Sequence, residues 1–142
     1  MLRASYLIVV AALMAGCVTT KYEGEDHPYR VLMRDMKPHY KTLDNFSKDP
    51  ALAKEAAAAC DELVILGEKG QKMKPGFLKS YERKAHGQLF AAIASTCKIH
   101  AAYIRSGDVA RGQAVYAELS EIKKRGHTRY KDQAKAARGD DE

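Results

Sequence analysis

The stretch Ser47–Gly70, SKDPALAKEAAAACDELVILGEKG, carries a complete helix signal and decides the fold class. Asp49 can cap the helix, Pro50 suits its first position, and Gly67 or Gly70 can end it. Its apolar side chains recur every three or four residues and form one stripe, with Cys60 on the flank: Leu52, Ala56, Ala59, Leu63 and Leu66. Because the alanines are small, we expect another helix to approach this stripe closely.

Three further segments show the same helical spacing, and none shows the alternation typical of a strand. They run from about Pro28 to Phe46, from about Ser80 to Arg105 after the loop 71–80, and from an Asp108 cap to about Lys131. Their expected apolar faces are Tyr29, Leu32, Met33, Met36, Tyr40 and Leu43; Ala85, Leu89, Ile93, Thr96, His100 and Tyr103, flanked by Cys97; and Val115, Leu119, Ile122 and Gly126, with Tyr130 at the edge. Pro38 should kink or break the first of them. The pattern predicts an all-α, antiparallel up-down four-helix bundle.

The N-terminus reads as a targeting signal that precedes the fold. A charged start at Arg3 and a short apolar run lead to LMAGC, ending at Cys17, which resembles the lipobox of bacterial lipoproteins. We therefore expect a signal peptide over 1–16, acylation of Cys17, a lipidated tether over 17–27, the bundle over 28–131 and a polar tail over 132–142. In such lipoproteins Val18 favours the periplasmic face of the outer membrane, so the membrane is an expected partner through the lipid anchor.

Charge and motifs narrow the function classes. The chain has 24 Lys and Arg against 18 Asp and Glu, a modest and interspersed surplus, and an exported lipoprotein is not expected to bind nucleic acid. It carries no phosphate-binding glycine loop, no H-E-x-x-H and no legible Ser–His–Asp arrangement, so we predict that it is not an enzyme. Four acidic residues read as solvated helix faces: Asp61, Glu62, Glu118 and Glu121.

Two cysteines remain once Cys17 is assigned to lipid. Folding the second and third helices back about a loop near residue 75 brings Cys60 and Cys97 to comparable heights. In an oxidising compartment this placement predicts a disulfide. The alternative is a pair of reduced, buried small side chains.

The last two helices resemble a known family. LFAAIASTCKIHAAYIRSGDVARGQAVYAELSEIKKRGHTRYK, Leu89 to Lys131, is similar to the end of cytochrome c-prime and its soluble b-type relatives. His127, Tyr130 and Lys131 match the family's haem-ligand ending, while Lys123 and Gly126 stand where covalent attachment needs cysteines. The resemblance implies non-covalent haem b for electron transfer or ligand sensing, a homodimer, and a redox or envelope protein partner.

The same resemblance implies a ligand set. His127 and either Met36 or Met33, on the first helix, would hold the haem iron. Gly126 would leave room for the flat ring, and Arg125 or Arg129 could pair with the propionates.

The residues themselves leave alternatives open. At about 100° per residue, His127 lies about a quarter turn from its helix's apolar stripe, so it can equally be an exposed histidine at a basic helix end. His100 is either a hydrogen-bonded core histidine or a rival ligand. Met33, Met36 and His39 suit copper(I) or ordinary packing. The alternative function is a haem-free structural or protein-interaction bundle tethered to the membrane.

Overall fold

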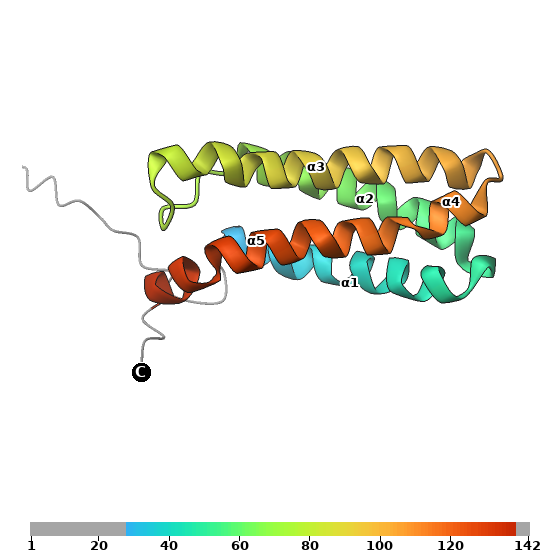
Figure 1. Ribbon diagram of the computed structural model, residues 1–142, viewed down its shortest axis with the longest axis horizontal. Helices are drawn as coiled ribbons and strands as arrows, with labels where there is room; N and C mark the ends of the chain where they lie inside the picture. Colours follow the sequence, from blue (N-terminus) through green and yellow to red (C-terminus); the bar gives the residue numbers. More distant parts are fainter. Residues whose placement is uncertain (1–27, 139–142) are drawn as a thin grey trace, which may run out of the picture.

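The computed structural model describes residues 28–138, which form an all-α four-helix bundle with no strand (Figure 1). Four long helices run alternately up and down, as predicted. The elements are α1 (Pro28–Lys48), the short 3-10 helix η1 (Pro50–Leu52), α2 (Ala53–Lys72), α3 (Ser80–Arg105), the one-turn helix α4 (Val109–Gln113) and α5 (Val115–Arg138). The expected signal peptide, the acylated Cys17 and the tether lie outside the described residues.

The turns follow from the capping residues that the sequence provides. The Asp49 carboxylate accepts a hydrogen bond from the Ala51 backbone N–H at 2.9 Å, and Pro50 then opens η1, which leads directly into α2. At the other turn, Gly107 has a φ of +87°, a conformation that favours glycine. Asp108 follows and accepts from the Arg111 N–H at 3.2 Å.

Three boundaries differ from those expected. Helix α1 continues through Pro38, held on the core by buried side chains on both sides of the proline, among them Met36 and Leu43. The expected last helix is divided at Ala114 into α4 and α5, and α5 continues past Lys131 to Arg138. In α1, the packing of the segments before and after Pro38 outweighs the loss of the single hydrogen bond that the proline removes.

Helices α2 and α3 share the most extensive interface of the bundle. A methyl group built on Gly70 would lie 2.2 Å from Cδ1 of Phe90, and one on Gly67 would lie 3.0 Å from the Phe90 carbonyl oxygen. Glycine is therefore required where α2 passes this ring. The two helices approach as closely as the small residues of α2 predicted.

The buried face of α3 is rotated by about one residue from the expected one. Its centre consists of His86, Phe90, Ile93, Cys97, His100 and Ile104. Leu89 and Tyr103 are only half-buried, and Cys60 and Cys97, which were expected to flank their stripes, are fully buried. Tyr130, expected at the edge, is 4% exposed. The reason is that α3 packs against α2, α4 and α5 together, so its buried arc is wider than a single stripe.

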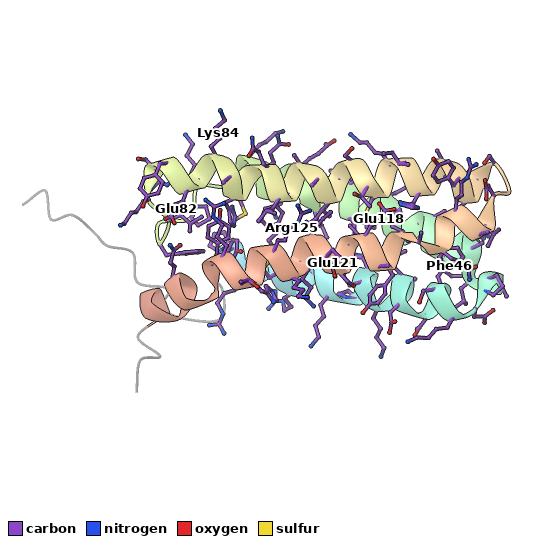
Figure 2. The ribbon with its side chains drawn as sticks, in the orientation of Figure 1. Phe46, Glu82, Lys84, Glu118, Glu121 and Arg125 are labelled. Carbon is purple, nitrogen blue, oxygen red and sulfur yellow. The ribbon has the colours of Figure 1, made fainter. Side chains whose placement is uncertain are left out.

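His100 is confirmed as a hydrogen-bonded core histidine. Its Nδ1 lies 2.8 Å from the Arg111 carbonyl oxygen and its Nε2 lies 3.1 Å from a carboxylate oxygen of Glu118. Glu118 is thus not simply a solvated residue, because it joins α5 to α3 (Figure 2). Asp61 likewise pairs with Arg105 across α2 and α3. These contacts explain His100 without any bound metal.

Cys60 and Cys97 face each other at the centre of the α2–α3 interface. Both are free thiols with 0% exposure. Their interaction with each other lowers the pKa of Cys60 and, together with burial, raises that of Cys97. The expected disulfide remains a prediction, and the two side chains are already in direct contact.

We expect the exported protein to carry the Cys60–Cys97 disulfide and to be more stable with it. In the chain-entropy model, closing a loop of this length stabilises a fold by about 4 kcal/mol. Mass spectrometry under non-reducing conditions, with and without thiol alkylation, measures the state of the pair. Recovery of two alkylatable thiols from envelope-derived protein contradicts the prediction.

A methyl group at Gly70 should destabilise the fold, whereas one at Gly126 should not. Gly70→Ala forces the buried Phe90 ring to move, and overpacking of this kind costs about 1–3 kcal/mol. Gly126→Ala meets only Leu89 Cδ1 at 3.4 Å, and alanine is favoured over glycine inside a helix by about 1 kcal/mol. Urea unfolding of the two variants and the parent checks this. Equal loss of stability in both variants would contradict the account of the α2–α3 interface.

Candidate functional site

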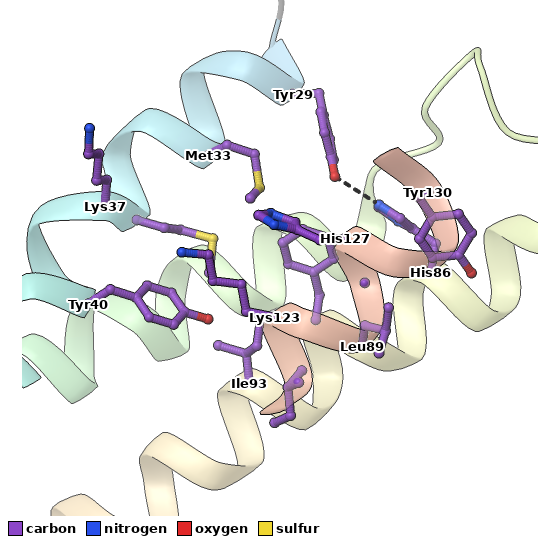
Figure 3. A pocket seen from close by; sticks show the side chains of 14 residues that line it. Tyr29, Met33, Lys37, Tyr40, His86, Leu89, Ile93, Lys123, His127 and Tyr130 are labelled. Atoms are coloured by element: carbon purple, nitrogen blue, oxygen red, sulfur yellow. Dashed lines mark hydrogen bonds between the residues drawn. The ribbon is translucent and has the colours of Figure 1, made fainter. Parts of the chain in front are cut away.

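A pocket of about 490 Å³ lies between α1 and α5, near the end of the bundle where α1 begins (Figure 3). This volume is within the range of small-molecule and cofactor sites. Contacts between α1 and α5 are far fewer than those between α2 and α3, which leaves room for it. Its walls are Tyr29, Met33, Met36, Lys37, Tyr40, His86, Leu89, Phe90, Ile93, Ile122, Lys123, Gly126, His127 and Tyr130. Side chains from α1, α3 and α5 therefore meet around one largely apolar space.

The four residues assigned to a haem site from the sequence all line this pocket. Met33 and Met36 come from α1, and Gly126 and His127 come from α5. Met36 is 2% exposed, whereas Met33 is half-buried and His127 is exposed on its outer side. In Figure 3 the end of the Met33 side chain, from α1, is drawn beside the His127 ring, from α5. The pocket lining thus includes an imidazole from α5 and two thioethers from α1.

The position of the pocket explains why His127 reaches it despite its helix phase. The apolar stripe of α5 faces the centre of the bundle, with Val115 and Leu119 fully buried. The pocket lies to one side of that stripe, toward α1. The neighbouring row of α5, Lys123, His127 and Tyr130, therefore lines it together with Ile122 and Gly126 of the stripe. A residue a quarter turn from the stripe points at the α1–α5 gap instead of the core.

His86 is a pocket residue that the sequence reasoning missed. It is 2% exposed, and its Nε2 lies 3.3 Å from the Tyr29 hydroxyl (Figure 3). Its ring packs 5.0 Å from that of Phe90 and 5.4 Å from that of Tyr130, measured between centroids. Within residues 28–138, the His86 Nδ1 and the Tyr130 hydroxyl have no hydrogen-bond partner. The signal in the sequence is the spacing of three and four that joins His86 to Phe90, Ile93 and Cys97.

Burial keeps the inner wall of the pocket uncharged. It lowers the pKa of His86 from 6.5 to about 4 and raises that of Tyr29 from 10.0 to about 12. Burial also raises the pKa of Tyr40. At neutral pH these three side chains are therefore neutral. The charge in the pocket lining comes from Lys37 and Lys123, both exposed at its mouth.

Other candidates from the sequence lie away from the pocket. Arg125 and Arg129, expected near haem propionates, do not line it, whereas Lys37 and Lys123 do. His39 does not line the pocket with Met33 and Met36. His100 also lies outside the lining. The pocket retains two thioethers and two imidazoles as possible ligands.

Within residues 28–138 there is no group of three or more His, Cys, Asp and Glu side chains placed to hold a metal ion. The donor set of the pocket is different in kind, since it includes thioethers. Among the same residues, no helix has the length and apolar character needed to span a bilayer. No family model, curated protein or solved structure matches this chain.

Acid should destabilise the fold through His86. The unfolded chain binds a proton near pH 6.5 and the folded chain only near pH 4, so stability is complete above the first value and falls toward the second. The cost attributable to His86 reaches about 3 kcal/mol by pH 4. Urea unfolding from pH 7.5 to 4 should show a steeper loss in the parent than in His86→Phe.

His39→Ala is the matched control, because His39 lies on α1 outside the pocket, and it should keep the steep dependence of the parent. If the parent and His86→Phe lose stability in parallel, His86 is not held neutral by burial.

Proposed function

We propose that this protein binds haem b non-covalently in the α1–α5 pocket, where His127 and a methionine of α1 would hold the iron. Met33 is the favoured methionine because its side chain ends beside the His127 ring, and Met36 is the second choice. The proposed role is electron transfer or sensing of a small ligand. One observation carries the proposal: an imidazole from α5 and thioethers from α1 line the same largely apolar pocket (Figure 3).

The lining residues fit such a group in three respects. A nitrogen and a sulfur donor can together hold a haem iron, and neither requires a cysteine attachment. The aromatic and aliphatic walls, including Phe90, Ile93 and Leu89, suit a flat apolar macrocycle. A lysine from each of α1 and α5 can face carboxylates. The pocket as a whole therefore has an apolar interior and a cationic rim.

When bound, the iron would supply one-electron chemistry or bind a diatomic molecule. This chain's own residues would bind and orient it. His127 and Met33 would fix it from opposite helices, and the buried walls from α1 and α3 would exclude water from its faces. The neutral state of His86 and Tyr29 would keep the local dielectric low, which tunes a redox potential.

The place of action rests on the N-terminal sequence. We propose that lipid on Cys17 anchors the protein to the bacterial outer membrane on its periplasmic side. The bundle would then act close to a membrane surface, where redox or envelope protein partners are accessible.

Haemin titration of the full chain should give a Soret band with a stoichiometry of one. His127→Ala should abolish the band or weaken binding at least tenfold, because one strong ligand to the iron is lost. Met33→Leu should preserve the volume of the pocket wall and shift the band toward that of a five-coordinate or water-ligated haem. Absorption and resonance Raman spectra measure both changes.

His39→Ala is again the control, since it removes an imidazole outside the pocket and should leave the spectrum unchanged. A folded parent protein that stays colourless with excess haemin would refute the proposal. The haem-free interaction bundle would then be the better account of the same fold.

A further inference from the structure

Two lysines on facing helices stand at the mouth of the pocket. Lys37 comes from α1 and Lys123 from α5, and both are exposed (Figure 3). The Lys123 ammonium lies 5.8 Å from the centroid of the Tyr40 ring, so it rests over the rim of the pocket. The pocket lining therefore includes one lysine from each helix, and in Figure 3 the Lys37 ammonium points away from the other labelled side chains.

Neither lysine is neutralised by the described part of the chain. No aspartate or glutamate lines the pocket. No ion pair within residues 28–138 involves Lys37 or Lys123, whereas Lys48 and Lys98 each have a carboxylate partner. Exposed lysines alone do not indicate a binding site. These two, however, line an apolar pocket whose lining includes no aspartate or glutamate to pair with them.

We infer that Lys37 and Lys123 form a carboxylate subsite that fixes the orientation of the bound porphyrin, with its propionates at the mouth. This inference rests on the proposed function and deepens it. Carboxylates are the charge that an ammonium pair recognises, and they remain partly hydrated at this rim. In this inference the two lysines take the role that the sequence analysis assigned to Arg125 or Arg129.

The opposite end of the pocket argues for the same orientation. His86, Tyr29 and Phe90 form its wall, and burial keeps His86 and Tyr29 uncharged. A carboxylate placed there would lose its hydration without gaining a cation, which is strongly unfavourable. The charge distribution of the pocket therefore allows one arrangement of an amphipathic ligand, with its apolar edge inward and its acidic edge outward.

The test compares haemin with haemin dimethyl ester, in which both propionates are uncharged. The proteins are the full chain, Lys37→Met, Lys123→Met, the double variant, and Lys124→Met as the control. Lys124 is the exposed neighbour of Lys123 and does not line the pocket. Each pocket substitution should weaken haemin binding about two- to fivefold, the range for partly exposed ion pairs. The ester should bind all five proteins equally, and added salt should weaken haemin binding more than ester binding.

Equal haemin affinity in the parent and the double variant would overturn the inference while leaving the proposed function standing. If the parent binds no haemin, the proposed function fails. The carboxylate subsite is then tested on the same proteins by comparing their affinities for dodecanoate and for dodecanol. A preference for dodecanoate that is lost in the double variant supports a carboxylate site for an acyl chain. The absence of that preference overturns the subsite.

Discussion

The tight contact between α2 and α3 is the constraint on which the rest of the structure depends. Glycines at 67 and 70 let the backbone of α2 pass directly beneath Phe90, and Cys60 meets Cys97 at the centre of the interface. The salt bridges Glu68–Lys98 and Asp61–Arg105 lie along its exposed edge. This interface makes one half of the bundle compact and fixes the position of Phe90, which is also a wall of the pocket.

The other half of the bundle is more open, and this difference produces the pocket. At the far end, the Gln113 side chain of α4 donates to the Phe46 carbonyl oxygen of α1 at 2.9 Å, and His100 of α3 is hydrogen-bonded to the Arg111 carbonyl oxygen of α4. At the near end, Gln133 donates to the Glu82 carboxylate at 2.8 Å and joins α5 to α3. The contacts at the far end hold α4, which leads into α5, and the contact at the near end holds α5 itself, while the pocket separates the middle of α5 from α1. The resulting gap is apolar inside and cationic at its mouth.

Local signals in the sequence predicted most of the fold. Asp49 and Asp108 cap where expected, and the alanine-rich stripe predicted that another helix would approach α2 closely. The prediction of helix faces and boundaries was wrong where the apolar pattern of one helix carries no information about the helices that pack against it. The expected alternative of a break at Pro38 is wrong, because packing on both sides of the proline keeps α1 one helix, and the α3 face was displaced because three helices bury it together.

Part of the candidate site could also be predicted from the sequence. Met33, Met36, Gly126 and His127 were found through a resemblance in the sequence, and they do line one pocket. His86 and Lys37 were missed because neither belongs to a motif, and their importance follows only from the three-dimensional arrangement of α1, α3 and α5. The helix phase of His127 argued against a ligand only under the assumption that any pocket would lie at the centre of the bundle.

Proton NMR of the reduced, haem-loaded protein tests the central claim most directly. A methionine that ligates the iron places its methyl group above the porphyrin face, where the ring current moves its resonance far upfield of the other methyl signals. We predict one such resonance, lost in Met33→Leu and in His127→Ala and retained in Met36→Leu. A spectrum without any upfield-shifted methionine methyl, or one in which only Met36→Leu removes it, would contradict the assignment of Met33 and His127 as the pair that holds haem between α1 and α5.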